Sequence, residues 1–316
     1  MCGICGVVQL GGEPRQVVPP EVLDRMTDAM THRGPDDRGT VLEPGIALGA
    51  RRLSVIDVEG GHQPVGNEDG TIWAAQNGEI YNHGELRDAL RAEGHVLRSR
   101  CDTEIIPHLY ERDGAAFPER LLGMYGIAVW DRVRRRAVLA RDRLGVKPLY
   151  YARCGDLLVF GSELRSVLAS GLVDTALDYE AIEAYLVLGF VPGPRTPLAA
   201  VSKLPPAHRL VAGPGGVSVE AYWSYPRPDP GPRRLGVDHY AERLLEELDR
   251  SVRMRLMSDV PLGAMLSGGL DSSLIVALMA RHVPGRVETF SVGFSGADDN
   301  ELADARLVAD LVGAEH

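Results

Sequence analysis

Short apolar runs, many with alternating polar positions, recur through residues 4–161 and predict a series of strands. The expected strands are residues 4–10, 46–56, 72–76, 125–131, 137–141, 149–153 and 157–161. Apolar residues at helical spacing predict helices over residues 20–30, 85–93 and 104–112. Many short strands with turns between them, and few helices, favour a layered α/β domain built on antiparallel sheets.

A proline-rich segment interrupts this pattern. Four prolines fall within residues 226–232, where they remove backbone donors and fix φ, so regular structure is not expected there. We therefore predict a first domain over residues 2–225, a linker over residues 226–236 and a second domain over residues 237–316.

After the linker the pattern changes to an amphipathic helix and then to buried strands that alternate with helices. The helix is expected over residues 239–257, with one apolar face formed by Leu244, Leu245, Leu248, Val252 and Leu256. The elements expected next are a strand at 262–266, a glycine-rich loop at 267–270, a helix at 271–282, a strand at 288–293 and a helix at 300–312. This order predicts the start of a doubly wound parallel sheet. Two strands and two helices cannot cover both faces of such a sheet, so we expect the natural domain to continue past His316 or this product to be truncated.

Composition narrows the possible partners. The net charge of −10 argues against nucleic acid or an anionic membrane as a partner. No apolar run has the length of a membrane span, and no signal peptide is recognised. Cys2 and Cys5 have a CxxC spacing, but no second ligand pair follows, so a zinc site is not predicted for them. Free thiols predict a reducing, cytoplasmic location.

Cys2 is the first candidate for chemistry. Removal of Met1 would leave a thiol and a free α-amino group on one residue. A thiol needs a base to become a good nucleophile, and an α-amino group has a reference pKa of roughly 7.7–8.0. Cys2 is therefore a candidate for both nucleophile and base. The alternative is a small apolar residue at the edge of the first strand.

The segment Ser267-Gly268-Gly269-Leu270-Asp271-Ser272-Ser273 is the second candidate. It joins a predicted strand to a predicted helix, where glycines let the backbone approach a phosphate and free N–H groups face it. No Gly-Lys-Ser/Thr follows, so this is not a Walker P-loop. The alternative is an ordinary tight turn. The segment resembles the pyrophosphate loop of ATP pyrophosphatases, which cleave ATP between the α- and β-phosphates.

Together the two candidates resemble the glutamine-hydrolysing asparagine synthetases. The resemblance is carried by residues 1–4 (MCGI), 32–36 (HRGPD), 52–57 (RLSVID), 77–82 (NGEIYN), 101–104 (CDTE), 141–150 (RDRLGVKPLY) and 267–272 (SGGLDS). It implies an αββα sandwich of antiparallel sheets, of the N-terminal-nucleophile type, as a glutaminase domain. It also implies the start of a doubly wound parallel α/β ATP-pyrophosphatase domain.

The resemblance assigns expected roles in the first domain. Cys2 would attack the side-chain amide of glutamine, and Asn77 and Gly78 would form the oxyanion hole. Arg52 would bind the glutamine α-carboxylate, since a planar fork suits a carboxylate, and Glu79 and Asp102 would bind the α-ammonium. The segment 32–36 is expected to shape the pocket rather than to supply a base.

In the second domain the resemblance implies an ATP site. Ser267, Gly268, Gly269, Asp271 and Ser272 would bind the phosphates, with Asp271 a candidate Mg²⁺ ligand. Leu266 and Val292 would contact adenine through their backbone. The residues of the aspartate site are expected past His316.

The implied activity is asparagine synthesis, in which ammonia from glutamine amidates aspartate that ATP has activated as an acyl-adenylate. Alternatives are amidation of another carboxylate, a chain with glutaminase activity only, a phosphoribosyl or sugar-phosphate amidotransferase, and a regulatory paralogue. We expect the 316-residue chain to hydrolyse glutamine without making asparagine, and the full-length protein to be a homodimer.

Overall fold

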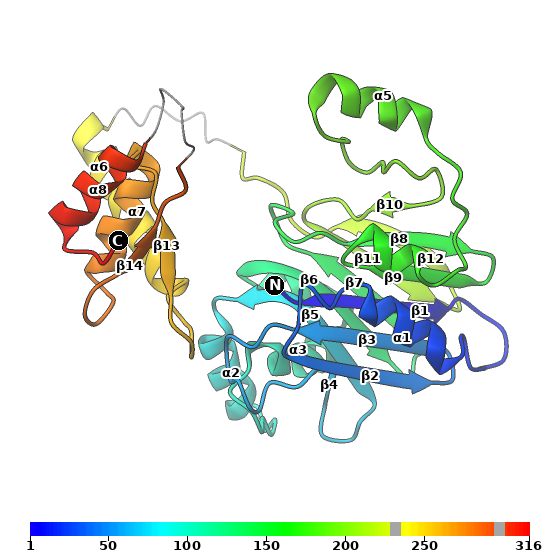
Figure 1. The fold of residues 1–316 in the computed structure, drawn as a ribbon. Helices are drawn as coiled ribbons and strands as arrows, with labels where there is room; N and C mark the ends of the chain where they lie inside the picture. Colours follow the sequence, from blue (N-terminus) through cyan, green and yellow to red (C-terminus); the bar gives the residue numbers. More distant parts are fainter. Residues whose placement is uncertain (228–234, 294–300) are drawn as a thin grey trace. The chain divides into compact units, whose positions relative to one another are not determined.

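The computed structural model describes residues 1–227, 235–293 and 301–316 and divides into two compact units, Met1–Pro226 and Arg227–His316. Figure 1 shows the fold of each unit. Most of the predicted linker, residues 228–234, lies outside the described residues.

Two six-stranded sheets form the larger unit, and every strand pair in them is antiparallel. The first sheet has the order β10 (Ser202–Lys203), β8 (Tyr150–Cys154), β9 (Leu157–Gly161), β1 (Gly3–Gln9), β3 (Ile46–Arg52) and β2 (Asp37–Glu43). The second has the order β12 (Gly216–Ala221), β11 (His208–Gly213), β7 (Arg136–Arg141), β6 (Gly123–Asp131), β5 (Ile72–Ile80) and β4 (Val65–Gly66).

The main core lies between the two sheets. Ile4, Leu48 and Phe160 of the first sheet and Trp130 and Leu139 of the second belong to one buried cluster. Strands present alternate side chains to opposite faces, so each sheet has a second set of buried residues for its outer face.

Helices cover those outer faces (Figure 1). On the first sheet lie α1 (Pro20–Asp28) and α4 (Leu164–Leu168). On the second lie α2 (His83–Ala92) and α3 (Ile105–Asp113), with the 3₁₀ turns η1 (Asp102–Glu104) and η2 (Gly114–Arg120) on either side of α3. The layers run helix, sheet, sheet, helix, which confirms the predicted αββα sandwich.

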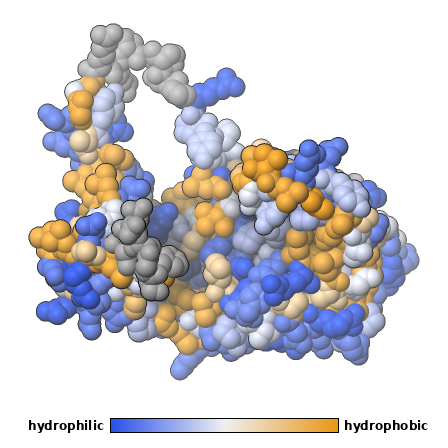
Figure 2. Space-filling model, turned by 45° about the horizontal axis from the view of Figure 1, so that its top comes forward, coloured by the Kyte–Doolittle hydropathy of each residue, from blue (hydrophilic) through white to orange (hydrophobic). Residues whose placement is uncertain are grey.

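Helix α5 (Tyr179–Leu188) differs from these, because apolar side chains such as Leu186 and Val187 are each 78% exposed. Figure 2 shows exposed apolar side chains gathered on the surface of both units. No helix among the described residues is long and apolar enough to cross a membrane.

The smaller unit contains a short parallel sheet, as predicted. Its elements are α6 (Val237–Met254), β13 (Gly263–Met265), α7 (Leu270–Ala280), β14 (Glu288–Phe290) and α8 (Leu302–Val312). β13 pairs in parallel with β14. Its core contains Val252, Leu266, Val276 and Ala305, whereas Leu244 and Leu245 of the predicted apolar face of α6 are exposed.

Two strands end at residues other than those predicted, and both differences affect the site. The strand predicted over 46–56 ends at Arg52, and the strand predicted over 72–76 continues to Ile80 as β5. Asn77 and Gly78 therefore lie within a paired strand, although Asn-Gly is a common turn dipeptide. The first residue of the predicted helix 300–312 lies outside the described residues, and α8 begins at Leu302.

Candidate active site

Strand β1 places Cys2 at one end of the first sheet, directly before the strand begins at Gly3. β1 pairs with β3 on one side and with β9 on the other, so the backbone next to Cys2 is held from both sides. Arg33 donates from Nε to the carbonyl oxygen of Cys2 at 2.9 Å, and its Nη1 lies 3.0 Å from Oε1 of Glu163. His32 contacts the same Glu163 oxygen at 3.0 Å. Arg33 of the HRGPD segment thus supports the backbone of the candidate nucleophile.

The thiol of Cys2 lies beside Leu53, whose backbone N–H donates to Sγ at 3.4 Å. Burial raises the pKa of the Cys2 thiol, although the Leu53 amide and the positive charges of the N-terminus and Arg52 act in the opposite direction. The resting thiol is therefore protonated at neutral pH, and attack on a carbonyl requires a base. Burial also lowers the pKa of the α-ammonium, which is carried by Met1 in this chain.

Asn77 and Gly78 lie on β5, opposite Gly126 and Tyr125 of β6. Asn77 is fully buried, and neither its Nδ2 nor its Oδ1 has a hydrogen-bond partner among the described residues. Gly78 has φ +148°, and a Cβ atom there would lie 1.9 Å from the carbonyl oxygen of Met124. A buried amide without a partner is costly, so a ligand that accepts a hydrogen bond is the expected partner.

Asp102 lies on η1 and is buried. Its Oδ2 accepts hydrogen bonds from Nε2 of Gln76 at 2.9 Å and from the backbone N–H of Ile80 at 2.8 Å. Its Oδ1 lies 3.5 Å from Sγ of Cys101. One carboxylate oxygen therefore holds β5 on both sides of Asn77 and Gly78.

Arg52 is the last residue of β3 and is buried. Its guanidinium donates to three backbone carbonyls: those of Ile56 at 2.6 Å, Asp57 at 2.8 Å and Val58 at 3.1 Å. Arg52 thus orders the loop after Leu53 in addition to facing the cavity described next.

A cavity of about 170 Å³ brings together all six residues predicted for glutamine hydrolysis. They are Cys2, Arg52, Asn77, Gly78, Glu79 and Asp102. The cavity thus offers a thiol and an unpartnered amide, and its other predicted residues include charges of both signs. That combination suits an amino acid whose side-chain carbonyl faces Cys2.

Sequence reasoning missed Lys147, which is buried and lines the same cavity. Burial lowers the pKa of its ammonium group. Asp142 positions this residue by accepting the Lys147 backbone N–H at 2.9 Å, and Arg141 donates from Nε to the Lys147 carbonyl at 2.7 Å. Lys147 is one of two lysines in a chain whose other basic side chains are mostly arginines. This rarity is the sequence feature that could have marked it as a candidate.

In the smaller unit, a loop of residues 266–269 joins β13 to α7, and Ser272 lies in the first turn of α7. Oγ of Ser267 and Oγ of Ser272 are 3.0 Å apart, and the Gly269 N–H donates to Oγ of Ser267 at 3.3 Å. Gly268 has φ +82°, a conformation that favours glycine. No side chain caps the N-terminus of α7, so its first N–H groups are available to an anion.

A second cavity, of about 330 Å³, opens next to this loop. Leu266, Ser267, Ser272 and Val292 of the predicted ATP site line it, together with Glu301. Gly268, Gly269 and Asp271 are not among its lining residues. The uncapped helix and the serine hydroxyls fit a phosphate group. Asp271, in the first turn of α7, supplies a carboxylate of the kind that Mg²⁺ takes, beside a site for phosphate oxygens.

Comparisons with known proteins agree with the division of the chain into two units. Residues 1–223 match the family model of the glutamine amidotransferase domain, and residues 243–316 match that of asparagine synthase. The chain is 35% identical over 317 residues to glutamine-hydrolyzing asparagine synthetase 1 of Bacillus subtilis (strain 168), a match over 100% of this chain and 49% of that protein. It is 34% identical over 342 residues to a putative glutamine-hydrolyzing asparagine synthetase 2 of Methanocaldococcus jannaschii, a match over 100% of this chain and 64% of that protein.

Another relative is named as an amidase and not as an asparagine synthetase. Amidase chry2 of Gibberella zeae is 32% identical over 345 residues, a match over 100% of this chain and 50% of that protein. The chain thus spans about half the length of most of these curated relatives.

A solved structure shares the fold. Glutamine phosphoribosylpyrophosphate amidotransferase from B. subtilis, complexed with ADP and GMP, has a TM-score of 0.54 at 14% identity, and the match covers 99% of this chain and 89% of that chain. The predicted resemblance to glutamine-hydrolysing asparagine synthetases is confirmed by the sequence matches. The amidotransferase family model matches residues 1–223, which is well over half of this chain. The chain therefore belongs to the glutamine amidotransferase family.

Proposed function

We propose that the larger unit hydrolyses glutamine at Cys2. The observation that carries this proposal is the amide of Asn77, which is fully buried, has no hydrogen-bond partner among the described residues and lines the same cavity as Cys2. A donor held without a partner in a cavity is preorganised for charge that develops there during a reaction.

The proposed mechanism begins after removal of Met1, when the α-amino group of Cys2 accepts the thiol proton. The thiolate attacks the side-chain carbonyl carbon of glutamine, and Nδ2 of Asn77 and the N–H of Gly78 stabilise the oxyanion. The ammonium group then returns its proton to the leaving nitrogen, and ammonia departs. Water hydrolyses the remaining thioester, which gives glutamate and restores the thiol.

Charged residues of the cavity account for selection of a free amino acid. Arg52 would bind the α-carboxylate, and Glu79 and Asp102 would bind the α-ammonium. Oδ2 of Asp102 already holds β5, so Oδ1, which lies 3.5 Å from Sγ of Cys101, is the oxygen that would contact the ligand. The buried ammonium of Lys147 adds a positive charge close to Glu79.

For the smaller unit we propose a part of an ATP site that serves asparagine synthesis. Ser267, Gly268, Gly269 and Ser272 would hold the phosphates, Leu266 and Val292 would face the adenine, and Asp271 would hold Mg²⁺. ATP supplies the adenylyl group that activates the aspartate carboxylate toward ammonia. This proposal rests on the loop geometry and on the names of the relatives.

The test is glutamate release from glutamine by the wild-type chain, a Cys2→Ala variant and a Cys154→Ser control. Cys154 also carries a free, partly buried thiol, but it lies on β8 and does not line the cavity. We expect Cys2→Ala to abolish hydrolysis and Cys154→Ser to retain it. Hydrolysis by the Cys2→Ala variant at the wild-type rate would contradict the assignment of Cys2 as the nucleophile. In a full-length protein, Cys2→Ala should spare synthesis from ammonia, because ammonia bypasses the first site.

A second candidate is amidation of a carboxylate other than aspartate, which the similarity to a protein named amidase chry2 favours. Incubation of the full-length protein with glutamine, ATP and Mg²⁺ with or without aspartate, followed by pyrophosphate measurement, separates the two. Pyrophosphate release that requires aspartate supports asparagine synthesis.

We also propose that the full-length protein is a homodimer. The four free cysteines support a location in a reducing compartment such as the cytoplasm.

A further inference from the structure

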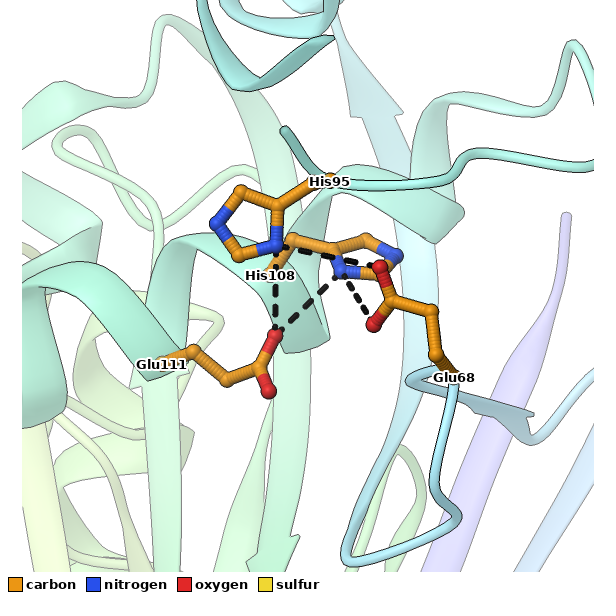
Figure 3. A group of neighbouring side chains, drawn as sticks. All are labelled: Glu68, His95, His108 and Glu111. Carbon is orange, nitrogen blue, oxygen red and sulfur yellow. Dashed lines mark ion pairs between the residues drawn. The ribbon is translucent and has the colours of Figure 1, made fainter. Parts of the chain in front are cut away.

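Two histidines and two glutamates converge on the outer side of the second sheet, apart from the residues that line the glutamine cavity (Figure 3). Glu68 lies in the loop between β4 and β5, and His95 lies just after α2. His108 and Glu111 both lie on α3, where a spacing of three residues places their side chains on one face.

The separations among these groups are long for hydrogen bonds. Nδ1 of His108 lies 3.3 Å from Oε2 of Glu68 and 3.3 Å from Oε2 of Glu111. Nδ1 of His95 lies 3.5 Å from Oε2 of Glu111 and 3.9 Å from Oε1 of Glu68. N–H···O bonds are usually about 2.9–3.0 Å long. Donors bound tetrahedrally to Zn²⁺ at about 2.0–2.1 Å lie roughly 3.3–3.4 Å from each other. Three of the separations here are close to that value, and all the ligand atoms lie within 4.8 Å of one another.

A second observation is independent of these distances. His108 is 1% exposed, and its Nδ1 has no hydrogen-bond partner among the described residues. Figure 3 shows this nitrogen directed toward both carboxylates, with the His95 nitrogen on the same side. A buried imidazole nitrogen without a hydrogen bond is costly in a folded protein, and coordination to a cation would satisfy it.

The carboxylates are held in position through their other oxygens. Oε1 of Glu68 accepts the backbone N–H of Val96 at 2.8 Å, and Oε1 of Glu111 accepts Nδ2 of Asn67 at 2.8 Å. Oε2 of Glu68 remains directed at His108, and Oε2 of Glu111 remains directed at both histidines. Hydrogen bonds of this kind orient the ligands of protein metal sites.

The geometry points to a binding site for a divalent transition-metal ion of the zinc class, with Glu68, His95, His108 and Glu111 as its ligands. Four protein ligands complete a tetrahedral shell, so the ion has a structural role. It joins three segments: the β4–β5 loop, the segment after α2, and α3. Helix α3 follows η1, which carries Asp102, so the ion braces the element that positions β5.

The experiment measures Zn²⁺ binding to the whole chain after chelator treatment and dialysis. It compares the wild type with a Glu68→Gln/His95→Gln variant and with Glu111→Gln, all at partly exposed positions. His282→Gln is the control, because His282 pairs with Asp249 at 2.8 Å in the smaller unit and is not part of the cluster. Circular dichroism before metal addition establishes that each variant is folded.

We expect the wild type and His282→Gln to bind one more equivalent of Zn²⁺ than the site variants, and Zn²⁺ to raise their melting temperature by several degrees. Co²⁺ at this site should give tetrahedral d–d absorption without sulfur-to-metal charge transfer, which separates it from binding at the free thiols. Equal Zn²⁺ stoichiometry in folded wild type and site variants, or a cobalt spectrum with thiolate character only, would overturn the proposal. These readouts do not depend on glutamine hydrolysis.

Discussion

Oδ2 of Asp102 accepts a hydrogen bond from the side chain of Gln76 at 2.9 Å, and this contact fixes β5 immediately before Asn77. The same oxygen accepts the N–H of Ile80 at 2.8 Å, so one buried carboxylate spans the stretch that contains the proposed oxyanion hole. Asp102 therefore has a positioning role in addition to the substrate contact proposed for it. The sequence motif alone cannot distinguish the positioning role from substrate binding, because both roles require a buried carboxylate.

Asn77→Ala should separate stability from catalysis. The Asn77 side chain makes no hydrogen bond among the described residues, so its removal loses none, and we expect the melting temperature to change by only about a few degrees. The kcat for glutamine hydrolysis should fall about 10²–10³-fold, as for other lost oxyanion donors. Gln76→Ala is the contrasting variant, since it removes a buried hydrogen bond to Asp102 and should lower the melting temperature more. Unchanged kcat in Asn77→Ala would remove Asn77 from the oxyanion hole.

Arg52→Lys should raise KM for glutamine strongly and change kcat less, because a lysine lacks the planar fork that binds a carboxylate. The variant should also lose stability, since the single nitrogen of a lysine cannot reproduce the positions of the two guanidinium nitrogens that donate to the carbonyls of residues 56–58. Arg51→Lys is the matched control, because the neighbouring arginine pairs with Asp28 and does not line the cavity. Steady-state kinetics with both variants checks the prediction, and an unchanged KM in Arg52→Lys contradicts it.

The pH dependence of hydrolysis should follow the α-amine. Because burial raises the pKa of the Cys2 thiol, the thiol stays protonated near neutral pH and the rate depends on the fraction of neutral amine. kcat/KM should therefore rise with pH through the amine pKa, with activity lost as pH falls below it.

Retention of Met1 is the companion experiment. An N-terminal extension that keeps Cys2 inside a peptide bond, verified by mass spectrometry, should abolish hydrolysis while the melting temperature stays close to that of the processed protein. Normal turnover by the extended protein would show that another group is the base.

Gly268→Ala should weaken ATP binding at least tenfold without affecting glutamine hydrolysis. The added Cβ would lie 2.6 Å from Cβ of Asp304 and 2.7 Å from the backbone nitrogen of Ala305, in a residue with φ +82°. Gly285→Ala is the control, because Gly285 has φ +92° but nothing within 4 Å of an added Cβ. Calorimetric titration of both variants with ATP and Mg²⁺ checks the prediction. Equal affinity in the two variants would exclude the loop from the phosphate site.

Motifs and apolar periodicity predicted the residues that gather in the first cavity and most of the elements that carry them, because these residues lie in or beside strongly patterned strands. The strands β2, β4, β10, β11 and β12 were missed, and all of these except β11 lie at the edge of a sheet. β2 reads Asp-Arg-Gly-Thr-Val-Leu-Glu and β12 is largely exposed, so neither has the apolar pattern of a buried strand. Lys147 was missed as a cavity residue because its position depends on how Arg141 and Asp142 fold the preceding loop.

The four residues of the proposed metal site gave no signal in the sequence for a different reason. They come from three segments that meet only when α3 packs on β5, and apart from the His108–Glu111 pair they have no fixed spacing. The predicted end of the strand at 76 was wrong because Asn-Gly favours a turn locally, whereas pairing with β6 extends the backbone there.

The order in which the chain visits the two sheets has a consequence for synthesis on the ribosome. β1 to β3 belong to the first sheet, β4 to β7 to the second, β8 to β10 to the first again, and β11 and β12 to the second. Cys2 is therefore translated before β6, the partner of β5, and the first sheet encloses β1 only once β9 exists. A nascent chain thus carries its thiol long before it has a pocket, and the hydrolysis proposed at Cys2 requires translation at least through β9, which ends at Gly161.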